Sequence, residues 1–271
     1  MHLRDASPQR KKIATILTFL SIPLSGFMTD IYLPSFPSMA RNLSVSEQSI
    51  QLTLTCFFLS YGFSQLFVGP VADSVGRRKP MLISLAVLLL SSLAVTFTGE
   101  VLVISLLRIV QGIATAFIVV AKRAYFVDLF DDEKRKHYLS YFTIVWSCGP
   151  IIAPFLGGFL EEHLGWQSNF YFLAIYAAIL FVGELVFSGE TIRNYKKFNL
   201  KKTGLLYLAM LKNPGFILGI AVLGCAYSVV MVFNIAGPFV VEQHFNYNAV
   251  IIGYCTLVLG FAWMISGILS K

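Results

Sequence analysis

Two side chains of opposite charge, Asp30 and Arg108, lie inside long apolar stretches of the chain. A charge at membrane depth is costly unless it faces a cavity or a partner, so such residues usually serve a function. An arginine does not readily deprotonate, but its charge can repel protons from a nearby carboxylate. We expect Asp30 and Arg108 to lie at similar depth and to face one hydrated chamber with Gln111, where Asp30 gains and loses a proton as cargo leaves. Two structural alternatives remain: Asp30 could cap its helix, and Arg108 could donate to backbone carbonyls.

Eight apolar stretches of about twenty residues are the elements that would position these charges. Hydrophobic residues make up 56% of the 271 residues and charged residues only 13%, against roughly 25% in a soluble domain. Only helices and closed barrels satisfy their backbone in lipid, and these stretches are too long for barrel strands. The sequence therefore predicts an all-α polytopic membrane protein with eight transmembrane helices, at approximately residues 13–33, 50–70, 79–98, 101–121, 139–160, 169–188, 214–235 and 249–269.

The basic residues indicate which way the stretches point. All but two of the 21 lysines and arginines fall on one side, in the N-terminal tail, in alternate connections and at Lys271. The exceptions are Arg41 and Arg108. Because positively charged connections stay in the cytoplasm, we expect a multi-pass protein of the plasma (inner) membrane with both termini cytoplasmic. Lys122 and Glu184, near the inner ends of their stretches, are expected to reach the membrane interface.

The remaining composition excludes several classes of protein. The net charge of +7 serves the topology, so lipid is the expected partner and nucleic acid is not. The four cysteines form no CxxC pair and the four histidines lack metal-ligand spacing, so we expect no disulfide, metal or cofactor. The sequence holds no motif of ATP-binding, hydrolase, metalloprotease or dinucleotide sites. We therefore expect no enzyme, and an ion gradient, most simply of protons, as the energy source.

The connection after the second stretch has the most specific spacing in the chain. It reads GPVADSVGRR from Gly69 to Arg78. The glycines allow a tight turn and close helix approach, and Asp73 can form a charge-assisted link to an arginine. We expect Gly69, Asp73, Gly76, Arg77 and Arg78 to latch one conformation at the inner mouth. The alternative is that this cluster only anchors the topology.

The fifth stretch carries a second group of small residues and prolines. It reads GPIIAPFLGG from Gly149 to Gly158. Pro150 and Pro154 are expected to kink the helix, and the glycines, including Gly157, to let the eighth stretch or another neighbour approach closely. Generic packing of small residues is the alternative.

Four segments, in this order along the chain, resemble motifs of the major facilitator superfamily. They are DIYLPSFP at residues 30–37, GPVADSVGRR, the R-x-x-Q-G pattern at 108–112, and GPIIAPFLGG, which has Ala153-Pro154 where many members have Gly-Pro. The first is similar to the Bcr/CflA group of drug-resistance transporters. The resemblance implies a proton-coupling role for Arg108, and the fourth segment resembles the family's antiporter motif.

The resemblance also implies a domain organisation. Family members have twelve helices in two bundles of six, with the substrate held between them. Here we expect a six-helix bundle at residues 1–190, a basic cytoplasmic linker at 191–212, and the first two helices of an incomplete second bundle at 213–271. The chain thus resembles a C-terminally shortened member.

These expectations combine into a function. We expect proton-coupled efflux, by antiport, of small amphipathic compounds or drugs, in which protonation of Asp30 releases the substrate outward. Two alternatives stay open. The chain could be a non-transporting remnant or an interaction partner of a full-length relative, or it could export another cargo such as a siderophore or sugar.

Overall fold

The structure is a computed structural model that describes residues 2–192 and 194–269. Two of the basic residues that support the predicted topology, Arg193 and Lys271, lie outside this part. Within it every regular element is a helix, as the sequence predicts.

All eight predicted stretches correspond to helices. The first stretch is a series of α1 (Pro8–Ser21), α2 (Leu24–Asp30), η2 (Leu33–Ser35) and α3 (Phe36–Asn42), and the others are α4 (Glu47–Val75), α5 (Arg78–Thr96), α6 (Val101–Leu129), α7 (Asp132–Leu164), α8 (Gln167–Phe187), α10 (Pro214–Gln243) and α11 (Ala249–Leu269). The linker adds a short helix, α9 (Leu200–Leu211). Among the described residues, seven segments are long and apolar enough to cross a membrane, and α11 contributes a shorter apolar helix. Several helices outrun the predicted stretches because polar side chains such as Ser46 and Asp131 cap them further out.

The first stretch is not the continuous helix that the sequence predicts over residues 13–33. Pro23 has no N–H group to continue the helical ladder, and α1 ends just before it. The hydroxyl of Tyr176 on α8 donates to the carbonyl of Leu20 at this break. A second break follows Asp30, where α2 ends and the chain turns into η2. Both breaks free backbone carbonyls that other helices then bind.

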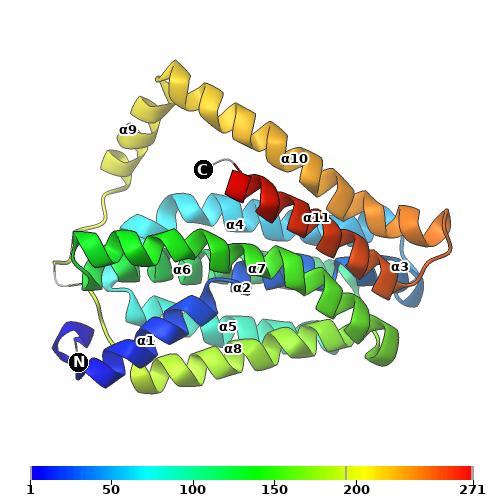
Figure 1. The fold of residues 1–271 in the computed structure, drawn as a ribbon, viewed down its shortest axis with the longest axis horizontal. Helices are drawn as coiled ribbons and strands as arrows, with labels where there is room; N and C mark the ends of the chain where they lie inside the picture. The colour runs from blue at the N-terminus through cyan, green and yellow to red at the C-terminus, as the bar shows by residue number, and fades with distance from the viewer. Residues whose placement is uncertain (1, 193, 270–271) are drawn as a thin grey trace.

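The helices of the first body, which we define as α1–α8, lie side by side (Figure 1). Within it α4 packs along α6, while α5 packs against both α6 and α8. The N-terminus and the connections α4–α5, α6–α7 and α8–α9 lie at one end of the body, and the α7–α8 connection and the α10–α11 turn lie at the other (Figure 1). The basic connections therefore share one end, as the topology predicts. We call it the inner end and its opposite the outer end.

The two helices after the linker contact the first body very differently. Helix α11 packs along α7, whereas the described buried residues of α10 are Gly237, Pro238 and Phe239, near its outer end. There Arg41 forms an ion pair of 2.7 Å with Glu242. The half of α10 that follows α9 is exposed along its length and diverges from the body (Figure 1).

Candidate functional site

Arg108 lies at the centre of the site, on α6, with no exposed surface. Its guanidinium donates to the Gln111 side-chain oxygen at 2.7 Å and to the Met28 carbonyl at 2.6 Å. It also lies over the rings of Tyr32 and Phe57, at 4.6 and 4.4 Å from their centroids. The structure thus brings Arg108 and Gln111 together, on one face of α6 as their spacing predicts.

The break in the first stretch explains why Arg108 binds a backbone carbonyl. Met28 lies in the last turn of α2, where carbonyls have no partner within the helix. A buried carbonyl without a donor is destabilising, and the positive charge of Arg108 also suits the negative end of a helix. Gln111 extends the network by donating to Ser92 of α5 at 3.3 Å. In this conformation Arg108 therefore makes the carbonyl contact that the sequence left as an alternative.

Asp30 is 4% exposed and lies two residues after the carbonyl that Arg108 binds. Asp30 is thus close along the chain to a residue that Arg108 contacts, and the expectation that both charges face one hydrated chamber stays a prediction. No ion pair between them is present among the described residues, because Arg108 is engaged by Met28 and Gln111. The Asp30 carboxylate is within electrostatic range of Tyr32 and of Tyr227 on α10. Asp30 therefore lies near the boundary between the first body and α10.

At the inner end, the predicted link between Asp73 and an arginine is present. Arg77 contacts Asp73 at 3.1 Å and also forms an ion pair of 2.6 Å with Asp128 at the end of α6. Thr191 donates its hydroxyl hydrogen to Asp128 at 2.9 Å. We did not identify Asp128 from the sequence. The one feature that could have suggested its role is its position as a carboxylate near the inner end of a predicted stretch.

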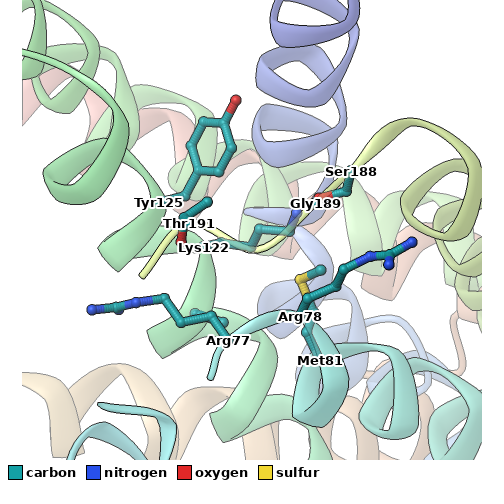
Figure 2. A pocket seen from close by; sticks show the side chains of 9 residues that line it. Arg77, Arg78, Met81, Lys122, Tyr125, Ser188, Gly189 and Thr191 are labelled. Carbon is teal, nitrogen blue, oxygen red and sulfur yellow. The ribbon is translucent and has the colours of Figure 1, made fainter. Parts of the chain in front are cut away.

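Glu190 is a second acidic residue that sequence reasoning missed, although it lies only two residues after the sixth stretch. Its carboxylate accepts backbone N–H bonds from Arg77 and Arg78 across the connection and from Thr191 and Ile192 beside it, at 2.9–3.2 Å. Figure 2 shows Arg77, Arg78 and Thr191 around a small pocket at this end. We call Asp73, Arg77, Asp128 and Glu190 the inner cluster.

The glycines and the second arginine of the connection have different roles in this cluster. Gly76 has φ +96°, and a side chain there would collide with the Glu190 carboxylate, so a glycine is required. The prediction that Gly69 allows a close approach of another helix is wrong for this structure, because no atom of another element lies within 4 Å of the position that its side chain would occupy. Arg78 donates its side-chain N–H to the Leu185 carbonyl at 2.9 Å.

Lys122 and Glu184 correct another expectation. Both were predicted at the membrane interface, but they form a buried ion pair between α6 and α8, with side chains 3% and 0% exposed. Thr18 of α1 lies 3.5 Å from the Lys122 ammonium group. Lys122 and Glu184 are 62 positions apart in the sequence, so only the packing of α6 on α8 brings them together.

The glycines of the fifth stretch are points of close helix contact, as expected. Gly149 packs against Pro23 at the first break, and Gly157 lies directly against the backbone of Ile31. Gly158 approaches the backbone of Ala249, at the start of α11. Pro150 and Pro154 lie inside α7, which runs as one helix through both and curves in its second half (Figure 1). Within the described residues, no group of three or more His, Cys, Asp or Glu could hold a metal ion.

Comparison with known proteins gives the family. A model described as Major Facilitator Superfamily matches residues 18–271. A bicyclomycin resistance protein homolog of Haemophilus influenzae is 37% identical over 164 residues, which are 60% of this chain and 41% of the relative. Multidrug resistance protein D of Escherichia coli is 29% identical over 210 residues, 77% of this chain and 52% of the relative. The chain thus spans about half the length of these relatives.

Solved structures of transporters share the fold. The nucleoside transporter NupG, as its D323A mutant, aligns with a TM-score of 0.75 at 15% identity, over 96% of this chain and 66% of its own. The human organic anion transporter MFSD10 aligns with a TM-score of 0.65 at 17% identity, over 94% and 70% of the two chains.

Proposed function

The chain belongs to the major facilitator superfamily, whose members are membrane transporters and not enzymes, and we propose that it serves in proton-coupled efflux of small amphipathic compounds. The observation that carries this proposal is the burial of Asp30 and Arg108 at the second break of the first stretch, with no ion pair between them in the described part of the chain. Discontinuous helices near mid-membrane are typical of substrate and ion sites in secondary transporters. The names of the two relatives, bicyclomycin resistance and multidrug resistance, favour drugs as the cargo.

In the proposed mechanism Asp30 carries the proton and Arg108 sets the conditions for its release. Arg108 is held by Gln111 and the Met28 carbonyl and forms no ion pair with Asp30 among the described residues, so Asp30 remains available to a proton or a cationic substrate. When Asp30 is ionised it can bind a cation, and when it is protonated that attraction disappears. Protonation from outside would then release substrate outward, and deprotonation inside would reset the site.

The domain organisation supports alternating access. We propose a six-helix bundle at residues 1–190, a cytoplasmic linker at 191–212 and a helix pair at 213–271 that belongs to a second bundle. Helix α10 meets the first body at its outer end, through Arg41–Glu242 and Phe36–Phe239, and diverges at its inner end. With both termini in the cytoplasm, this arrangement is open toward the inside.

The test is transport by the purified chain in liposomes. With a pH gradient imposed across the membrane, we expect movement of a cationic amphipathic dye such as ethidium against its concentration gradient, and Asp30→Asn should abolish it. Glu100→Gln, which changes an exposed carboxylate before α6, is the matched control and should retain movement. Dye movement that does not depend on the pH gradient, or a fully active Asp30→Asn variant, would overturn the proposal.

A second candidate function is association with another membrane protein. The observation that favours it is that the described buried residues of α10 are limited to Gly237, Pro238 and Phe239, which leaves most of this membrane-spanning helix without a helix neighbour. If dye movement requires co-expression of a second membrane protein that co-purifies with the chain, this candidate replaces independent transport.

A further inference from the structure

Helix α9 presents an apolar surface that no other described element covers. None of its residues is buried. Its exposed apolar side chains are Leu200, Leu205, Leu206, Leu208, Met210 and Leu211, each between 36% and 60% exposed. Figure 1 shows α9 at the inner end of the molecule, joining the first body to α10 and standing apart from the other helices. An exposed apolar surface of this kind needs a partner that is not water.

The charge around α9 has one sign. Five exposed lysines flank or begin the helix, namely Lys196, Lys197, Lys201, Lys202 and Lys212. The sequence contains no Asp or Glu between Glu190 and Glu242. A helix that combines lysines with large apolar side chains suits the boundary between lipid headgroups and acyl chains, where both parts find favourable surroundings.

One hydrogen bond fixes which face of α9 points outward. Pro70 inside α4 has no N–H, so the carbonyl of Leu66, four residues earlier, has no partner in its own helix. The hydroxyl of Tyr207 donates to this carbonyl at 2.5 Å. Thr203 and Gly204 share the Tyr207 face and are less exposed than their neighbours. Leu205 and the residues on its side of the helix therefore point away from the body.

We propose that α9 is an interfacial membrane helix that binds anionic lipids. Leu205, Leu206 and Leu208, which lie away from the Tyr207 face, insert among the acyl chains of the inner leaflet, and the lysines bind the phosphate groups of headgroups such as phosphatidylglycerol. Because α9 leads directly into α10, its attachment to lipid holds the inner end of α10 away from the first body. The content of anionic lipid therefore sets how readily the inner side closes.

The first experiment places α9 relative to lipid. The variant Leu205→Trp is reconstituted in vesicles of phosphatidylcholine and phosphatidylglycerol, with and without bromine atoms on the acyl chains. We expect the emission added by this tryptophan, measured against the parent protein, to be blue-shifted and quenched by the brominated lipid. If this tryptophan emits as it does in water, the proposal is overturned. Blue-shifted emission that bromine does not quench would also overturn it, because it would show that protein covers α9.

The second experiment tests the lysines. We expect phosphatidylglycerol to raise the Tm of the reconstituted chain more than phosphatidylcholine does, and Lys201→Gln with Lys202→Gln to weaken lipid binding by roughly fivefold for each lysine. The matched control is Lys134→Gln with Lys136→Gln, which removes two exposed charges from the same end of the molecule. An equal lipid response in the α9 variant and the parent would contradict the assignment.

Discussion

The inner end and the middle of the first body both bury charged side chains, but they satisfy them in different ways. At the inner end Lys122 is paired with Glu184, and Arg77 contacts two carboxylates. In the middle Arg108 binds a carbonyl and an amide oxygen, and within the described residues it has no ion pair with Asp30. Paired charges hold helices together, whereas a buried carboxylate without an ion pair can bind a proton or a cation.

This contrast separates residues that maintain the structure from residues that carry function. The Lys122–Glu184 pair joins α6 and α8, and the inner cluster joins the α4–α5 connection to α6 and to the linker. Asp30 joins no two helices through an ion pair in the described structure. Substitutions at the inner end should therefore affect stability, and substitution of Asp30 should affect transport.

The largest effect on stability is expected from Glu184→Gln. This change leaves the Lys122 charge buried without a counter-charge, which costs about 3–5 kcal/mol, while removing both charges in Lys122→Met with Glu184→Met should restore most of the stability. Thermal or denaturant unfolding in detergent measures both variants. If Glu184→Gln is as stable as the parent, the pair does not hold α6 and α8 together.

Arg108→Met should have the next largest effect, and it should affect transport as well. It leaves the Met28 carbonyl and the Gln111 side chain buried without a donor, which costs about 1–3 kcal/mol for each group. Arg41→Met, at an exposed ion pair, should cost at most about 1 kcal/mol. Equal losses in the two variants would show that Arg108 does not stabilise the break after α2.

Two glycines of one motif give the smallest but sharpest contrast. Gly76→Ala forces a side chain into a backbone with φ +96° and against Glu190, so we expect a loss of about 1–2 kcal/mol. Gly69→Ala adds a methyl group in open space inside a helix and should stabilise the chain by roughly 0.5–1 kcal/mol. A loss of stability at Gly69 similar to that at Gly76 would indicate a close contact at Gly69 that the structure does not show.

Much of the fold was predictable because it depends on local sequence. The apolar stretches gave the helices, and the small residues from Gly149 to Gly158 indicated a close helix contact. The break at Pro23 was missed because hydrophobicity continues across it, although the proline itself marked the position.

The charged contacts of the site were less predictable because they join distant residues. Asp73 and Arg77 are four residues apart and were identified. Asp128 and Glu190 come close to Asp73 and Arg77 only after the helices pack. The separate Lys122–Glu184 pair likewise forms only after α6 packs on α8. A carboxylate near the end of an apolar stretch, opposite an unmatched lysine or arginine, is the signal that could have suggested these contacts.

The central claim, that Asp30 exchanges a proton for a cationic substrate, has a direct test that needs no gradient. Ethidium is added to the purified chain in weakly buffered detergent solution, and a pH indicator reports proton release. The account predicts release of protons on dye binding by the parent protein and none by Asp30→Asn. Equal release from both proteins would contradict it.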